Sequence, residues 1–202
     1  MIKIETRRNG RPGASIVFRP NQDKILEALV WLANERPGLD QFHVAKVLFY
    51  ADKEHLNRFG RPILGDTYWA MEDGPAPSLA LDLTERDSRH LTGDLLEKSS
   101  EALSYDRSRD DNYLHIRAKR APNLDLFSRT DIECLSSALR TYGDMPMKEL
   151  WNLVHKEPSY LAIYRQGSAP AIIGYELFLD RNDPHYEEVV AELQESALET
   201  LL

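Results

Sequence analysis

Apolar side chains recur at helical spacing along several segments of this chain. After Asn21, which can cap a helix, Ile25, Leu29 and Leu32 fall on one face. Gly60 follows another such segment, in the position where glycine commonly ends a helix. The pattern therefore predicts helices at residues 22–36, 41–59, 77–86, 129–142, 146–155 and 184–201.

Shorter stretches alternate between apolar and polar residues, as strands do. Residues 66–71 predict a short strand, and residues 114–118 predict an edge strand. The polar residues 91–113 predict a variable loop with a strand near residues 103–105, and residues 158–170 are irregular or a short helical turn. The predicted fold class is mainly α with a small β component (α+β), a compact helical domain with a short sheet or hairpin.

Charge is distributed unevenly along the chain, whose net charge is −8. Residues 1–20 predict a basic N-terminal arm or hairpin, and residues 21–170 predict one domain. Residues 171–202 predict an acidic extension that ends in an amphipathic helix, with Arg181 as its only Lys or Arg. The acidic body argues against nucleic-acid binding, because phosphate contacts need a basic face, and only the arm is an exception.

The composition is that of a globular protein with enough apolar residues for a real core, 42% of 202. Cys134 is the only cysteine, which excludes a disulfide framework and a cysteine-type zinc cluster. No apolar run is long enough to span a bilayer, and the first residues lack the apolar stretch of a secretory signal. We therefore expect a cytoplasmic protein that makes no contact with membranes.

The sequence lacks the common motifs of catalysis. It has no Gly-rich phosphate loop, no Gly-x-Ser-x-Gly elbow and no His-Glu-x-x-His pair. The histidines are scattered, and none has the spacing to another that a helical metal site needs: His43, His55, His90, His115, His155 and His185. We therefore expect no metal, no cofactor and no enzymatic activity.

Asp52 and His55 are the pair best placed for acid–base chemistry. They lie three residues apart on a predicted helix, and a carboxylate beside an imidazole raises the imidazole pKa. We favour a buried network in which the two side chains satisfy each other and nearby polar groups. A small hydrolase that uses the pair is the alternative.

Glycine and proline set the turns around the predicted strand, because glycine supplies positive φ and proline fixes φ. The residues concerned are Gly60, Arg61, Pro62, Gly65, Asp66, Gly74, Pro75 and Pro77. We assign them, together with His155, a structural role.

Aromatic and sulfur side chains give the candidates for contact with a partner. Tyr68, Trp69 and Met71 alternate along the strand, so one face could be exposed. Tyr50 shares a polar helix face with His43 and Lys46 and reads as solvated, with a binding face as the alternative. For Trp151 we favour a core position, and a partner contact is the alternative.

The run from Lys46 to Ser78, with a second match in residues 128–164, resembles a known family. Its motifs are Lys46-Val-Leu-Phe-Tyr-Ala-Asp52, Glu54-His55, Gly60-Arg-Pro-Ile63, Gly65-Asp-Thr-Tyr68-Trp-Ala-Met71 and Gly74-Pro-Ala-Pro-Ser78. In order and spacing they are similar to the Panacea domain, also called the SocA-like or phage-associated GepA-like antitoxin domain. The resemblance covers about residues 22–165 and departs from the family pattern at Trp69, Ala76 and Trp151.

The resemblance implies a bacterial antitoxin of a type II toxin–antitoxin system, which neutralises a cognate protein toxin by direct binding. It also implies an alternative, a proteolytic adaptor that delivers the toxin to a AAA+ protease. A DNA-binding autoregulator that uses the N-terminal arm is a further alternative from the charge pattern. The residues carry no signal for an oligomeric state.

Overall fold

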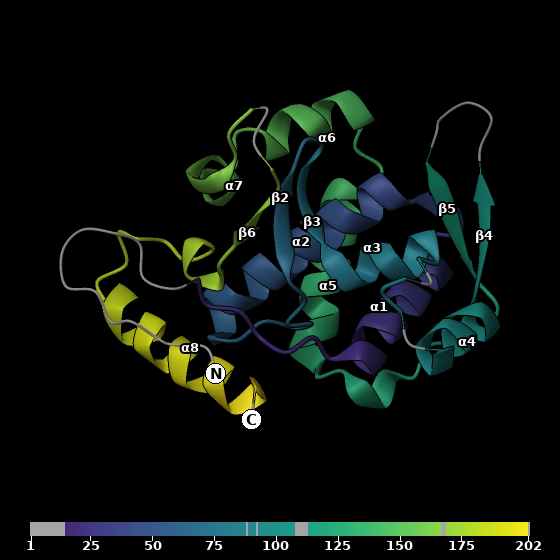
Figure 1. Ribbon diagram of the computed structural model, residues 1–202, viewed down its shortest axis with the longest axis horizontal. Helices are drawn as coiled ribbons and strands as arrows, with labels where there is room; N and C mark the ends of the chain where they lie inside the picture. The colour runs from purple at the N-terminus through teal and green to yellow at the C-terminus, as the bar shows by residue number, and fades with distance from the viewer. Residues whose placement is uncertain (1–14, 88, 92, 108–112, 167–168, 202) are drawn as a thin grey trace.

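The computed structural model describes residues 15–87, 89–91, 93–107, 113–166 and 169–201, and these form an α+β fold (Figure 1). This confirms the predicted class, a mainly helical chain with a small β component. The helices are α1 (Gln22–Glu35), α2 (Gln41–Phe59), α3 (Ser78–Glu85), α4 (Gly93–Ala102), α5 (Arg129–Tyr142), α6 (Met147–Val154), α7 (Pro158–Ile163) and α8 (Tyr186–Leu201). The strands are β1 (Leu39–Asp40), β2 (Tyr68–Met71), β3 (Gly74–Pro77), β4 (Leu103–Arg107), β5 (Leu114–Ala118) and β6 (Ala171–Ile173), with short 3₁₀ turns η1 (Leu124–Leu126) and η2 (Tyr175–Leu177).

Helices α1, α2 and α5 build the main core, and their predicted ends are confirmed. The side chains of Asn21 and Asp40 cap α1 and α2, and Gly60 ends α2 in the left-handed conformation with φ 72°. Ser128 and Asp131 form a reciprocal capping box at the start of α5. Local sequence chemistry thus fixes where the three central helices begin and where α2 ends.

A first sheet has the strand order β1-β5-β4, with all pairs antiparallel. The prediction of an edge strand at residues 114–118 is wrong, because β5 lies between β1 and β4. The prediction of a loop for residues 91–113 is also wrong over α4. This helix is polar overall, but Leu95 and Ala102 are buried, so packing stabilises a segment whose sequence looks like a loop.

A second sheet has the order β3-β2-β6 and lies across α2 (Figure 1). The turn predicted at Gly74–Pro77 is instead strand β3, paired with β2 at the sheet edge, where proline is tolerated. The predicted extension from residue 171 begins with β6, which pairs with β2. Tyr175 and Phe178 then pack into a second core with Phe49, so the predicted division at residue 170 separates a strand from its sheet.

The ends of the described chain meet beside this second core. Ile16 and Phe18 are buried in it, and the Ile16 amide donates to Glu176 at 2.9 Å. Leu193 and Ala197 give α8 a buried face, which fits the predicted amphipathic helix, and Leu201 at its end is 53% exposed. The hairpin predicted for the N-terminal arm lies mainly outside the described residues.

Replacing Ser128 by alanine should lower the free energy of unfolding by about 1 kcal/mol, because the Asp131 amide then loses its cap acceptor. Urea titration followed by circular dichroism measures this change. Thr141→Ala, at an exposed position of the same helix, is the control and should change stability by less than about 0.5 kcal/mol. Equal effects of the two substitutions would contradict the assigned role of the cap.

Candidate functional site

The motif-rich run of α2 and the β2–β3 hairpin is organised by the fully buried carboxylate of Asp52. One oxygen accepts hydrogen bonds from the amides of Ile63 and Leu64, at 2.8 and 3.0 Å. The other accepts from the hydroxyls of Tyr68 and Tyr175, at 3.1 and 3.2 Å. Burial raises the pKa of Asp52, and these four donors oppose that shift. Asp52 therefore joins the chain after α2, strand β2 and turn η2.

His55, one turn further along α2, belongs to a different network. Its Nδ1 donates to the carbonyl of Arg61 at 2.8 Å, and its Nε2 lies 3.0 Å from the hydroxyl of Thr130 and 3.1 Å from Asp131. Burial alone would raise the pKa of Asp131, but hydrogen bonds from His55 and Lys24 hold it well below its usual range. The predicted Asp52–His55 pair is therefore replaced by two separate networks.

The hydrolase alternative needs a reactive pair that substrate can reach. Asp52 and His55 are both 0% exposed, and their hydrogen bonds go to structural groups of the fold. Burial of this kind satisfies polar groups in the core and leaves no surface for a substrate. The geometry does not support catalysis by this pair.

The remaining turn residues hold the β2–β3 hairpin and the start of α3. Asp66 accepts from the amides of Thr67, Leu79 and Ala80, at 2.7 to 3.0 Å, and burial raises its pKa to about 7. Gly65 has φ 66°, and a side chain there would press on Phe18. Arg61 donates hydrogen bonds to Asp131 and Ser128. Pro62, two residues after Gly60, is buried. Strand β3 contains Gly74, Pro75 and Pro77.

Two of the aromatic partner candidates are placed differently from the prediction. Tyr68 is fully buried against Asp52, so it cannot contact a partner in this conformation. Tyr50 is half-buried and stacks on Tyr142, with ring centroids 4.1 Å apart. Its neighbours His43 and Lys46 are buried, so the solvated helix face predicted for them is wrong. The pattern misled because α5 and β3 cover this face.

The other candidates gather around the tip of the hairpin, where α6 and α7 flank it (Figure 1). Trp151 is 40% exposed and stacks on His155 at 3.7 Å, so the preferred core position is wrong. His155 Nε2 donates to the carbonyl of Glu72 at 2.9 Å, and the Tyr160 hydroxyl donates to that of Met71 at 2.8 Å. These bonds join both helices to the hairpin.

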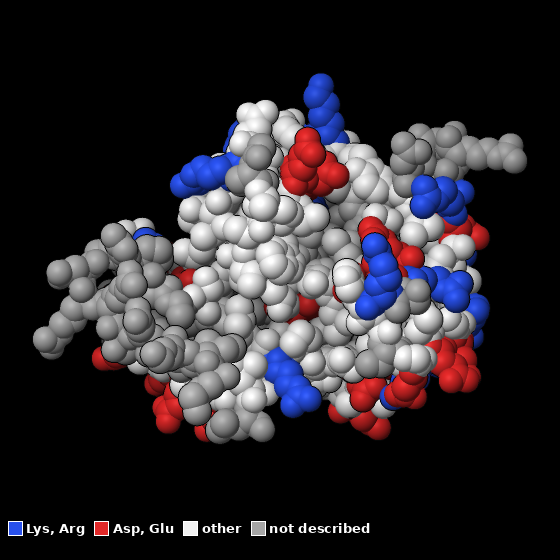
Figure 2. Space-filling model, in the orientation of Figure 1, with Lys and Arg blue, Asp and Glu red and all other residues white. Residues whose placement is uncertain are grey.

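We call the exposed residues Met71, Trp151 and Leu161 the hairpin-tip surface, with exposed fractions of 39%, 40% and 50%. Trp69 lies beside Met71 in β2 and is half-buried. In Figure 2 uncharged residues cover the area over β2 and β6, and a blue Lys or Arg side chain lies beside them near α7. Met71 and Trp151 were candidates from the sequence, but Leu161 was not, because the surface is assembled from a strand end and two short helices.

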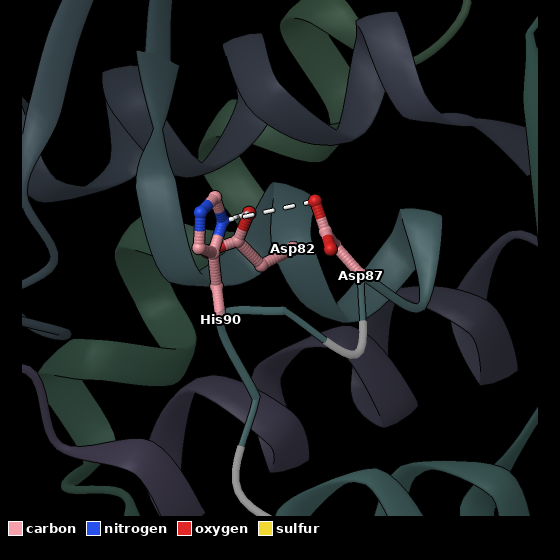
Figure 3. Close-up of side chains that lie close together, drawn as sticks. All are labelled: Asp82, Asp87 and His90. Carbon is pink, nitrogen blue, oxygen red and sulfur yellow. Dashed lines mark hydrogen bonds and ion pairs between the residues drawn. The ribbon is translucent and has the colours of Figure 1, made fainter.

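Among the described residues, Asp82, Asp87 and His90 form a group in which a metal could be considered (Figure 3). His90 Nδ1 lies 3.3 Å from Asp82 and 3.7 Å from Asp87. Arg89, however, donates to both oxygens of Asp87, at 2.9 and 2.5 Å, and holds the pKa of that carboxyl well below its usual range. An arginine fork already neutralises the carboxylate, so we assign no ion to this exposed turn.

Lys46, the first residue of the family motif, is buried, although the sequence predicted a solvated helix face for it. Its side chain lies between α2 and β3, where Nζ donates to the carbonyl of Pro75 at 3.0 Å and stands 4.8 Å from the centre of the Phe42 ring. Burial lowers its pKa to about 7, and the charge of Asp73 opposes this shift. The chain therefore holds an amine in its interior that titrates near neutral pH.

Comparison with known proteins gives one family. The model of a family described as antitoxin SocA-like, Panacea domain, matches residues 44–160, which is more than half of the chain. The match begins within α2 and ends within α7, so it contains Asp52, the β2–β3 hairpin, Met71 and Trp151, and it ends one residue before Leu161. Neither a curated protein nor a solved structure matches the chain. No described helix is long and apolar enough to cross a membrane.

Replacing Asp52 by alanine should lower the free energy of unfolding by about 3 kcal/mol or more, because two buried amides lose their acceptor and two buried hydroxyls keep only the carbonyls of Leu48 and Asp66. Urea titration of the purified variant measures the change. Glu101→Ala, at an exposed position of α4, should have an effect within about 0.5 kcal/mol. A similar small effect for Asp52→Ala would contradict its central role.

Replacing Lys46 by methionine should raise stability near neutral pH by about 1–4 kcal/mol, because a buried charge is removed and the stem is kept. In the wild type the folded pKa is about 7, below the ordinary 10.5 of the unfolded chain. Between about pH 7 and about pH 10.5 Lys46 is protonated in the unfolded chain but neutral in the folded chain, so the free energy of unfolding rises with pH over this range. Below about pH 7 Lys46 is protonated in both states, and its contribution no longer changes with pH.

Urea titrations at about pH 6 and about pH 9 should therefore show this rise in the wild type and its loss in Lys46→Met. Lys148→Met, at an exposed lysine of α6, should keep the wild-type dependence. Identical pH profiles for the wild type and Lys46→Met would contradict the burial of a titrating amine.

Proposed function

The chain belongs to the SocA-like Panacea antitoxin domain family, and from this premise we propose that it neutralises a cognate protein toxin by direct binding in the cytoplasm. The observation that supports the binding step is the hairpin-tip surface. Its three apolar side chains, Met71, Trp151 and Leu161, stay exposed, although each follows a buried residue of its own element, Ala70, Leu150 or Tyr160. A protein contact is the usual reason for such a surface.

The geometry favours this surface as the centre of an interface. Trp151 is held by its stack on His155, and His155 is in turn held by the Glu72 carbonyl. A side chain fixed before binding loses little conformational entropy when the partner arrives. Tryptophan is also among the residues that most often dominate binding energy in protein interfaces.

Binding rather than catalysis is also the role that suits the polar groups of this fold. Asp52 and His55 make hydrogen bonds to main-chain groups of the fold, and Arg89 donates to Asp87 in the Asp82–Asp87–His90 group. The outer face of α8 adds exposed acidic residues, including Glu187, Glu188, Glu192 and Glu195. These charges would speed association with a basic toxin, because complementary charge steers encounter.

Replacing Trp151 by alanine should weaken toxin binding by about tenfold or more, since loss of a central aromatic costs at least about 1–2 kcal/mol. The partner is the product of the neighbouring toxin gene, and calorimetry with the purified pair measures the affinity. Growth rescue by co-expression measures neutralisation in cells. Both readouts should fall together.

A matched pair of leucines supplies the control. Leu161 is 50% exposed in the hairpin-tip surface, and Leu124 is 53% exposed in η1, away from it. Leu161→Ser should weaken binding, and Leu124→Ser should leave it unchanged. Full neutralisation by Trp151→Ala and Leu161→Ser would refute this interface, and failure of the wild type to bind the toxin would refute the function itself.

A further inference from the structure

A cavity of about 200 Å³ lies beneath the β2–β3 hairpin, between the first turns of α2 and the end of α3. Its walls include Phe42 and Lys46 from α2, Met71 and Gly74 from the hairpin, and Tyr113 before β5. Neither the family's implied activity nor the hairpin-tip surface requires this space. The volume suits one side chain or a small organic molecule.

The amine of Lys46 is the polar group of this cavity that water reaches least. The residue is 2% exposed, and the hydrogen bond that the structure gives its Nζ is the one to the Pro75 carbonyl. An ammonium group has three donors, so it can serve a further acceptor. Gly74 keeps the space beside the amine open, because a Cβ there would lie 3.3 Å from Nζ and 2.7 Å from Val154.

The charges at the cavity differ in how strongly water screens them. Glu72, Asp73 and Glu85 line it as exposed residues, so their fields are weakened by solvent. Lys46 is buried against Phe42 and Pro75, where electrostatic interactions are stronger. The buried amine therefore favours a negative ligand charge in the interior, against the more strongly screened carboxylates of Glu72, Asp73 and Glu85.

We propose that this cavity binds a carboxylate on a short aliphatic stem, with Lys46 Nζ donating to the carboxylate and Phe42 and Met71 packing around the stem. A free short-chain acid and a glutamate side chain of a bound protein share this chemistry. The site is separate from the exposed residues of the proposed toxin interface, apart from Met71, which borders both.

Protonation links this binding to pH. A carboxylate needs the ammonium form of Lys46, and the pKa of the free amine is about 7. The group on a neighbouring element that opposes this lowering is Asp73, with Glu72 and Glu85 further along the walls. The ammonium fraction falls by about tenfold between about pH 6 and about pH 8, so affinity should fall by the same factor.

Nuclear magnetic resonance titration of the whole chain with sodium propionate tests the site, and propionamide is the neutral control of the same shape. Propionate should shift the signals of Phe42, Lys46 and Gly74 with a Kd on the order of 1–10 mM at about pH 6, and propionamide should not. N-acetyl-glutamate amide imitates a glutamate side chain of a bound protein, and N-acetyl-glutamine amide is its neutral control. If propionate binds and N-acetyl-glutamate amide does not, the ligand is a free short-chain acid. If both compounds bind, the site also accepts a glutamate side chain.

Variants separate this site from a general salt effect. Lys46→Met should abolish the response, and Lys148→Met, at an exposed lysine, should keep it. Because Lys46→Met could alter folding, the wild-type comparison of propionate with propionamide at both pH values decides the proposal independently. Equal responses to the two compounds, no response to propionate at about pH 6, or tighter binding at about pH 8 would overturn it.

Discussion

The buried carboxylate of Asp52 is the interaction on which the rest of this structure depends. It accepts hydrogen bonds from two amides of the chain that leaves α2 and from two tyrosine hydroxyls, one in β2 and one in η2. A buried charge is tolerated only when such donors surround it. The requirement for these donors fixes β2, the residue 60–67 connection and η2 against one helix, and it joins the two hydrophobic cores.

The β2–β3 hairpin, held in place by Asp52, in turn positions helices α6 and α7 and the side chain of Lys46 on α2. Main-chain carbonyls at its tip accept from His155 and Tyr160, while the Pro75 carbonyl accepts from Lys46 on the other side. The same four-residue strands therefore support the exposed Trp151 outside and border the cavity inside. Proximity of the two features makes the hairpin the part of the fold where a partner and a small ligand could influence one another.

Part of the fold could be predicted because local chemistry determines it. Asn21, Asp40, Gly60 and the Ser128 capping box act within one helical turn, so their effect is visible in the sequence. The helix α4 could not be predicted, since two buried side chains stabilise it against its polar composition. Strand β6 was missed for a similar reason, as its pairing partner is about one hundred residues away.

The candidate site divides in the same way. By itself the sequence determined the helix ends, the turn glycines and prolines, and the motif order that identifies the family. Only the tertiary structure decided that Asp52 and His55 serve different networks, that Tyr68 is buried and Trp151 exposed, and that Lys46 faces a cavity. The physical reason is that burial and hydrogen-bond partners depend on groups from distant segments, whereas caps and turns depend on the neighbouring few residues.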